Sequence, residues 1–311
     1  MTTLLQRVKS KMFIFAHRKA RGLLDGEYGS VFKGRSLDFD DLRAYVPGDE
    51  VRDIDWKASA RHGSPLIRRY VASRQQDVLL VVDTGRNMAA EALSGEAKKD
   101  IAVLALGVLG SLALNHGDPV GLVAGNSGGI RSLPAKSGEA HLERLLRVAD
   151  DVGVDTAPSA PDALLEYVVR TFRRRMLLFV VADEGTLGPS AERLLKRLRA
   201  QHEILWLTIR DADLTAPATS KAPATSAGPE TPAAQAPAGG FLRDVVSRAA
   251  VVPSVALSAD VAAAYYRAQA ERDAARAAIL RRAGVTEGSV GAGTDVVRAL
   301  FALLERHRRG G

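Results

Sequence analysis

The chain has 311 residues, of which 46% are hydrophobic and 25% charged, and such a composition is typical of a folded globular protein. It contains no cysteine, which excludes disulfides, thiolate metal sites and cysteine nucleophiles and leaves oxygen or imidazole ligands for any metal. Its net charge of +7 is spread over separate basic clusters, an arrangement that argues against nucleic-acid binding.

Neither a membrane-spanning segment nor a signal peptide is expected. No apolar run of the sequence reaches the roughly 18–20 residues that cross a bilayer. Residues 1–21 mix Lys, Arg and His with apolar residues and lack the apolar centre of a signal peptide. We therefore expect a cytoplasmic protein.

The first predicted element is an amphipathic helix over residues 4–21. Its apolar residues recur at helical spacing, and its basic residues lie elsewhere on the helix. Such a helix either packs on the domain beside it, which is the more common case, or lies on a membrane surface. Residues 25–70 are rich in Gly, Asp and Arg and predict short strands and turns, so that residues 1–75 form a small N-terminal helix and β-rich region.

From residue 76 onward, predicted strands alternate with predicted helices. Residues 78–82 are a continuous apolar run with β-branched residues, as expected for a strand covered on both faces. The alternation predicts a three-layer α/β domain over residues 76–311, with a mostly parallel sheet and helices on both faces. The other predicted strands cover residues 120–124, 130–133 at an edge, 176–182 and 204–209, and the helices cover residues 97–115, 141–148, 163–172 and 189–201.

An Ala/Pro/Thr-rich stretch at residues 212–240 interrupts this domain. It has almost no large apolar residue, which predicts a disordered insertion. The elements expected after it are a strand over residues 250–257, a long Ala/Arg-rich helix from a Ser258 cap to Ala283, a stop at Gly284 and a last helix over residues 295–307 capped by Thr294.

Two carboxylates come directly after predicted buried strands. Asp83 follows residues 78–82, and Asp183 follows residues 176–182. Ligands of open parallel sheets bind beyond the carboxyl ends of the strands, and two carboxylates with nearby hydroxyls or amides suit Mg²⁺. The alternative is that each Asp caps its own loop or the following helix.

The residues around Asp83 resemble the metal-ion-dependent adhesion site of von Willebrand factor A domains, which has the pattern Asp-x-Ser-x-Ser. Here the stretch is Asp83-Thr84-Gly85-Arg86-Asn87-Met88, so Gly85 removes one hydroxyl while Asn87 still offers a side-chain oxygen. Asp183 matches the later metal-site Asp of that family. The loop at residues 125–136, where we sought the intervening Thr, contains only Ser127 and Ser132. The resemblance implies a von Willebrand factor A-like fold with a degenerate site of Asp83, Asn87 and Asp183, weak for Mg²⁺ or Mn²⁺.

A longer resemblance lies upstream. Residues 42–61 are LRAYVPGDEVRDIDWKASAR, similar nearly position by position to the motif of the domain of unknown function 58 family, with its Arg-x-Tyr, Pro-Gly-Asp and Arg-x-Ile-Asp-Trp-Lys groups. That family places the motif just before the first strand of a von Willebrand factor A-like domain, as here. The chain is therefore identified as a member of that family, and residues 42–61 are its signature segment.

The signature segment alternates basic and acidic residues, which can pair and fix a surface geometry. Tyr45 and Trp56 can anchor either a small core or an interface. The segment is thus either a structural clasp that joins the N-terminal region to the sheet or a docking site. Its candidate residues are Arg43, Tyr45, Asp49, Arg52, Asp53, Asp55, Trp56, Lys57 and Arg61.

The family resemblance implies a non-enzymatic adaptor that works with a MoxR-type AAA+ ATPase in the maturation or assembly of other proteins. The chain has no phosphate-binding loop, so ATP chemistry belongs to the partner. No cofactor is expected apart from weakly held Mg²⁺ or Mn²⁺. Two alternatives stay open: a metal-dependent hydrolase that uses Asp83 and Asp183, or a basic scaffold on a membrane surface or nucleic acid. The six histidines lack short metal-ligand spacing, which argues against the hydrolase.

Overall fold

A computed structural model describes most of the chain. The described residues are 3–15, 24, 26, 28–29, 39–46, 49, 51, 54–70, 76–185, 187–213, 242–243, 250–251 and 259–310. The predicted insertion therefore lies outside the described residues from residue 214 onward, as do the Ser258 cap and two of the candidate residues of the signature segment, Arg52 and Asp53.

A six-stranded sheet forms the centre of the protein. The strand order is β10-β7-β6-β3-β4-β5, and every neighbouring pair is parallel except β4 and β5, which are antiparallel. The strands are β3 (Val78–Asp83), β4 (Val120–Asn126), β5 (Gly129–Lys136), β6 (Leu177–Asp183), β7 (Glu203–Ile209) and β10 (Thr286–Val290). Strands β3 and β6 are buried along their whole length, because helices cover both faces of the sheet.

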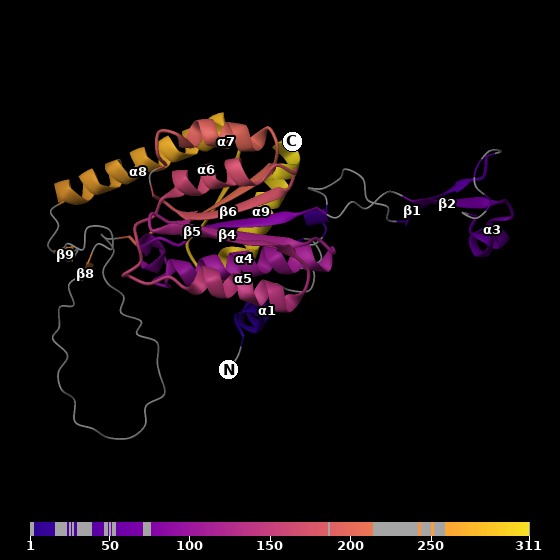
Figure 1. Ribbon diagram of the computed structural model, residues 1–311, viewed down its shortest axis with the longest axis horizontal. Helices are drawn as coiled ribbons and strands as arrows, with labels where there is room; N and C mark the ends of the chain where they lie inside the picture. The colour runs from indigo at the N-terminus through magenta and orange to yellow at the C-terminus, as the bar shows by residue number, and fades with distance from the viewer. Residues whose placement is uncertain are drawn as a thin grey trace, which may run out of the picture.

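Two hydrophobic cores, one on each face of the sheet, make the predicted three-layer arrangement (Figure 1). The first core involves α1 (Leu4–Phe15), α4 (Lys98–Asn115), α5 (Glu139–Asp150) and α9 (Val296–Gly310). The second involves α6 (Pro161–Thr171), α7 (Ala191–Arg199) and the end of α8 (Ala259–Arg282). Successive residues of β3 point to opposite faces, so that Leu80 and Val82 join the first core while Leu79 and Val81 join the second.

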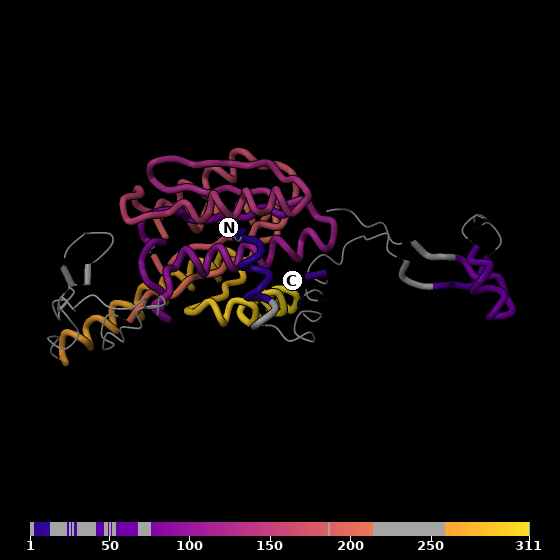
Figure 2. Tube along the Cα trace, turned by 90° about the horizontal axis from the view of Figure 1, so that it is seen from below, coloured from indigo at the N-terminus to yellow at the C-terminus, as the bar shows by residue number. Residues whose placement is uncertain are grey.

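Helix α1 packs on this domain, as the more common alternative for its amphipathic pattern predicts. Leu5 and Val8 are buried in the first core, against α4 and α5. Gly107 of α4 permits the close approach, because a Cβ atom there would lie 2.7 Å from a Val8 methyl group. The Glu143 carboxylate of α5 accepts hydrogen bonds from the Leu4 and Leu5 amides at 3.2 and 2.8 Å. Figure 2 looks at the molecule from the side on which α1 lies.

Tyr28 makes a second contact between the N-terminal region and the sheet domain. Its side chain is fully buried, and its hydroxyl donates to Asp118 Oδ2 at 2.9 Å. Burial, together with the Asp118 charge, raises the pKa of Tyr28. Asp118 Oδ1 also accepts the Gln76 amide at 2.8 Å, so that one carboxylate joins two segments just before β3 and β4.

Tyr28→Phe is expected to lower the free energy of unfolding by about 1–3 kcal/mol, because it leaves a lone pair of the buried Asp118 without its donor. Urea denaturation followed by circular dichroism measures the change. Tyr167→Phe is the matched control, since Tyr167 packs against the second core and its hydroxyl has no hydrogen bond among those found in the described residues. Equal effects of the two substitutions would show that the Tyr28–Asp118 bond contributes nothing.

In the C-terminal part, one strand was not predicted and one predicted strand lies mostly outside the described residues. Strand β10, which pairs in parallel with β7, was not predicted; it follows Gly284, whose φ of +69° ends α8 as expected. In the region predicted as a strand over residues 250–257, only β9 (Ala250–Val251) is described, and it pairs with β8 (Leu242–Arg243) as a separate ribbon. No helix in the described ranges is long and apolar enough to span a membrane.

Candidate functional site

The structure brings Asp83 and Asp183 to the same edge of the sheet. They end β3 and β6, which are adjacent parallel strands in register from Val78–Leu177 to Val82–Val181. The chain leaves β3 toward β4 on one side and later returns to β6 on the other, so this edge lies at the switch in strand order, where ligands of such sheets bind. Both side chains are buried.

Asp83 belongs to the α6 side of the sheet. It shares a strand face with Leu79 and Val81, and its Oδ1 accepts the Gly85 amide at 2.8 Å. Burial raises the pKa of Asp83 to about 6; the nearby Ser159 hydroxyl opposes this shift, and the charge of Asp183 adds to it. A carboxyl group in such surroundings is protonated much more readily than one in water.

Ser159 occupies the space that a side chain at position 85 would need. A Cβ atom on Gly85 would lie 2.3 Å from Ser159 Oγ and 2.4 Å from Ser159 N. The hydroxyl group that lies near Asp83 is therefore that of Ser159, in the connection between α5 and α6. The sequence had led us to expect such a hydroxyl in residues 125–136. Within the described part of the chain, the Oδ1 atom of Asn87 is a buried atom without a hydrogen-bond partner.

Asp183 belongs to the opposite side, where α4 begins. The ammonium group of Lys98, in the first turn of α4, lies 3.5 Å from Asp183 Oδ2 and also contacts Asp211, which follows β7. Burial disfavours the charged form of Lys98, but the Asp183 and Asp211 carboxylates outweigh burial and raise its pKa. The Asp183 Oδ1 atom accepts the Gly185 amide at 2.9 Å. Lys98 was not among the residues predicted from the sequence.

A second set of charges continues from this edge to α8. Glu184 Oε1 lies 2.9 Å from Arg210 Nε, and Glu184 Oε2 accepts the Asp211 amide at 3.1 Å. Arg276 of α8 donates to the Glu184 carbonyl at 3.1 Å and to Glu287 Oε1 of β10 at 3.0 Å. These hydrogen bonds join α8 at Arg276 to the residue that follows β6 and to β10.

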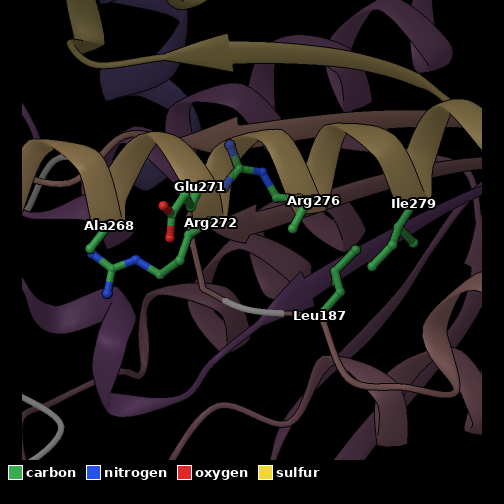
Figure 3. A pocket seen from close by; sticks show the side chains of 7 residues that line it. Leu187, Ala268, Glu271, Arg272, Arg276 and Ile279 are labelled. Carbon is green, nitrogen blue, oxygen red and sulfur yellow. The ribbon is translucent and has the colours of Figure 1, made fainter.

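Arg276 also borders an open groove of about 390 Å³ along α8 (Figure 3). The groove is lined by Leu187, Ala268, Glu271, Arg272, Ala275, Arg276 and Ile279. Leu187 and Ile279 form an apolar end, and Glu271 and Arg272 lie toward the other end. None of the residues predicted from the sequence lines this groove.

The signature segment folds into a small unit of β1 (Phe39–Ala44), α3 (Trp56–His62) and β2 (Leu66–Tyr70), which we call the signature unit. Strands β1 and β2 are antiparallel, and α3 lies against β2; the substantial contacts of these described elements are with one another (Figure 1). The expected strands are present, whereas helix α3 was not predicted. It begins where the Asp55 carboxylate accepts the Lys57 and Ala58 amides at 3.1 and 3.0 Å.

One pair of charged residues, Arg43 and Asp49, is bonded within the unit. The Arg43 guanidinium donates to both oxygens of Asp49 at 2.7 and 2.6 Å, and this hydrogen bonding lowers the pKa of Asp49. Asp49 also accepts the Val46 amide at 3.0 Å, which closes the turn between them.

Large apolar side chains of the unit are exposed. Trp56 is 66% exposed, and Val46 and Val51 are 56% and 59% exposed. Lys57 and Arg61 are exposed beside Trp56 on α3, whereas Tyr45 is half-buried. The unit therefore presents an aromatic ring, aliphatic side chains and positive charge to its surroundings.

A model of the family described as protein of unknown function DUF58 matches residues 41–217, which is more than half of the chain. The chain belongs to the DUF58 family. The match contains the signature segment and extends through β7, so the predicted membership is confirmed. The domain that follows the signature segment has the mostly parallel sheet with helices on both faces that the sequence predicts.

Three relatives of this DUF58 protein have the description uncharacterized protein. Uncharacterized protein Rv1480 of Mycobacterium tuberculosis is 29% identical over 202 residues, which cover 62% of this chain and 61% of the relative. Mb1516 of Mycobacterium bovis has the same identity and coverage. The chain thus spans about three fifths of the length of these relatives. YeaD of Bacillus subtilis is 28% identical over 107 residues, 34% of this chain and 24% of that protein.

Three solved structures resemble the DUF58 protein at low identity. BatB of Bacteroides thetaiotaomicron has 13% identity and a TM-score of 0.45 over 75% of this chain and 99% of its own. A von Willebrand factor type A protein of Catenulispora acidiphila has 7% identity and a TM-score of 0.38, covering 76% and 44%. The SpRpn10 VWA domain has 14% identity and a TM-score of 0.31, covering 45% and 78%.

Proposed function

We propose that this DUF58 protein is a non-enzymatic adaptor that docks onto a partner protein through its signature unit. The observation that carries the proposal is the exposure of three large apolar side chains of the signature unit, Trp56, Val46 and Val51. Tryptophan is the residue type most enriched among side chains that dominate binding energy at interfaces. A clasp that joins two parts of one chain is expected to bury its tryptophan instead.

The internal bonds of the signature unit support docking. The Asp55 cap fixes the start of α3, and the Arg43–Asp49 pair fixes the turn after β1. A surface held in place before contact loses less conformational entropy on binding, which favours affinity. The exposed Lys57 and Arg61 make an acidic rim on the partner favourable.

The partner class that we propose is a MoxR-type AAA+ ATPase. The support is the family resemblance of the signature segment, together with the absence of a phosphate-binding loop from the sequence. In this arrangement the ATPase supplies the energy of ATP hydrolysis, and the DUF58 protein supplies the contact. The joint task is the maturation or assembly of another protein.

We also propose that the adhesion-type site at the sheet edge is degenerate and takes no part in docking. Gly85 offers no hydroxyl, and Asp183 is already paired with the buried ammonium of Lys98. A hard divalent cation needs several free oxygen ligands, preferably carboxylates. The donors Asp83, Asn87 and Asp183 do not meet this need together, because a metal at Asp183 must first displace the ammonium.

Trp56→Ala is expected to weaken binding to a MoxR-type ATPase from the same genome by about 30-fold, the loss that corresponds to about 2 kcal/mol at a hot spot. Isothermal titration calorimetry of the two purified proteins with a non-hydrolysable ATP analogue measures the dissociation constant.

The matched control is Tyr266→Ala, since Tyr266 is an aromatic residue that is 50% exposed on α8, away from the signature unit. It is expected to leave the dissociation constant unchanged. Circular dichroism shows whether each variant keeps its fold. Wild-type protein that binds no such ATPase, or equal losses from both substitutions, would contradict docking through the signature unit.

A further inference from the structure

Two features of the surroundings of Lys98 disfavour its positive charge. The residue is only 2% exposed, and lysine is almost never this buried unless it is paired. It also lies in the first turn of α4, where the helix dipole favours anions over cations. An ammonium group stays there only if nearby negative charge outweighs both costs.

That negative charge comes from the ends of two adjacent strands. Asp183 Oδ2, at the end of β6, lies 3.5 Å from the ammonium nitrogen, and Asp211, two residues beyond β7, contacts it from the other side. Asp83, at the end of β3, contributes a weaker attraction to the same ammonium. The ammonium thus contacts two carboxylates, one at the end of β6 and one just beyond β7.

Carboxylates that converge from strand ends need a counter-charge, which a divalent metal commonly supplies. A metal that binds Asp183 here would lie next to the ammonium, and two cations at this separation in a buried site repel strongly. The side chain of Lys98 has 3% exposure, so the ammonium cannot withdraw into solvent without a change in the first turn of α4.

We infer that the Lys98 ammonium is the resident cation of this sheet edge, held covalently by the chain in the charge-balancing role of a divalent metal. The edge consequently needs no metal, and removal of the ammonium leaves Asp183 and Asp211 free to take Mn²⁺ or Mg²⁺ from solution. This inference extends the proposal of a degenerate site and does not depend on docking through the signature unit, which the calorimetric experiment tests separately.

Thermal unfolding with and without metal tests the inference. Wild-type protein and the variants Lys98→Met and Lys98→Arg are unfolded in EDTA and in millimolar MnCl₂. Methionine keeps the length of the side chain and removes its charge, whereas arginine keeps the charge. We expect Lys98→Met to unfold at a lower temperature than wild type in EDTA and to gain about 2–4 °C or more in MnCl₂, because a ligand that binds only the folded state raises Tm.

Wild-type protein and Lys98→Arg are expected to show no Mn²⁺-dependent change. Lys99→Met is the matched control for an adjacent lysine, since Lys99 donates to the Asp150 and Val152 carbonyls and not to the edge carboxylates. It is expected to show no metal response either. If Lys98→Met folds only in the presence of Mn²⁺, the same conclusion is reached more strongly.

Two results would overturn the inference, and they differ in meaning. If titration calorimetry shows that wild-type protein binds Mn²⁺ at one site with micromolar affinity, and Asp183→Asn abolishes this binding, the degenerate-site proposal fails as well. The other result is that wild type binds no metal and that Mn²⁺ changes neither the unfolding temperature nor the folding of Lys98→Met. In that case only the role assigned to Lys98 fails.

Discussion

Replacing Asp183 with alanine is expected to lower the free energy of unfolding by about 3–5 kcal/mol, the typical cost of breaking a buried ion pair, since the other partner of the Lys98 ammonium, Asp211, is 42% exposed. Asp183 and Lys98 are both buried, and water cannot replace the lost carboxylate beside the ammonium. The substitution also removes the acceptor for the Gly185 amide. Equilibrium unfolding in guanidinium chloride at neutral pH measures the loss.

Asp183→Asn separates the charge from the hydrogen bond. An asparagine can still accept the Gly185 amide, so a loss close to that of alanine would identify the charge as the main contribution. Asp211→Ala is the matched control, because it removes a second carboxylate from the same ammonium. The Asp211 side chain is 42% exposed, so solvent screens its pair with Lys98. A loss of only about 0–1 kcal/mol is therefore expected. Equal losses at the two positions would refute the burial argument.

Gly85→Ser is expected to lower the free energy of unfolding by about 1–3 kcal/mol, the usual cost of overpacking. From the sequence alone, this substitution is expected to restore part of the adhesion-type site, because it supplies the hydroxyl of the Asp-x-Ser-x-Ser pattern. In the structure the new Cβ atom would lie 2.4 Å from the backbone nitrogen of Ser159. The backbone of Gly85 is extended, with φ −70°, so the cost is steric and does not come from backbone strain.

The double variant Gly85→Ser/Ser159→Gly tests this explanation. It removes the Ser159 side chain but leaves its backbone, so most of the loss is expected to remain. The control is Gly153→Ala, at a position where nothing lies within 4 Å of the added Cβ, and where the change in stability is expected to be small. Urea denaturation measures all three. Full recovery in the double variant would show that only the two side chains clash.

The parts of the fold that are buried on both faces could be predicted from the sequence. Residues 78–82 and 176–182 are continuous apolar runs, and they became β3 and β6 within one residue at each end. Position 284 could be predicted as a helix end because glycine takes a positive φ without a steric penalty. In each of these cases one local property of the chain was sufficient to predict the element or its end.

Elements that depend on distant partners could not be predicted in this way. Strand β10 has the sequence Thr-Glu-Gly-Ser-Val, which has neither an apolar run nor alternation, and it exists because β7 offers it a parallel partner. Its Gly288 faces Leu303 of α9, whose Cβ would lie 3.3 Å from an added Cβ atom. Helix α3 is short and largely exposed, so apolar spacing gave no sign of it.

The same limit applies to the candidate site. Asp83 and Asp183 were predictable because each directly follows a buried strand, and parallel strands end at the same edge. Lys98 and Asp211 are 113 residues apart, and Ser159 lies in a connection between two helices, so no spacing along the chain links them to the edge. The clearest sign in the sequence would have been a lysine at the start of an otherwise apolar helix.

The burial of one tryptophan and the exposure of the other make the two halves of the molecule optically distinguishable. Trp206 of β7 is buried in the second core, whereas Trp56 is on the surface of the signature unit, and the sequence contains no other tryptophan. Emission from Trp206 therefore reports on the integrity of the sheet domain, and emission from Trp56 reports on whatever covers α3. A Trp56→Phe chain and a Trp206→Phe chain would each carry a single fluorophore, so that unfolding and complex formation can be followed separately in one unlabelled protein.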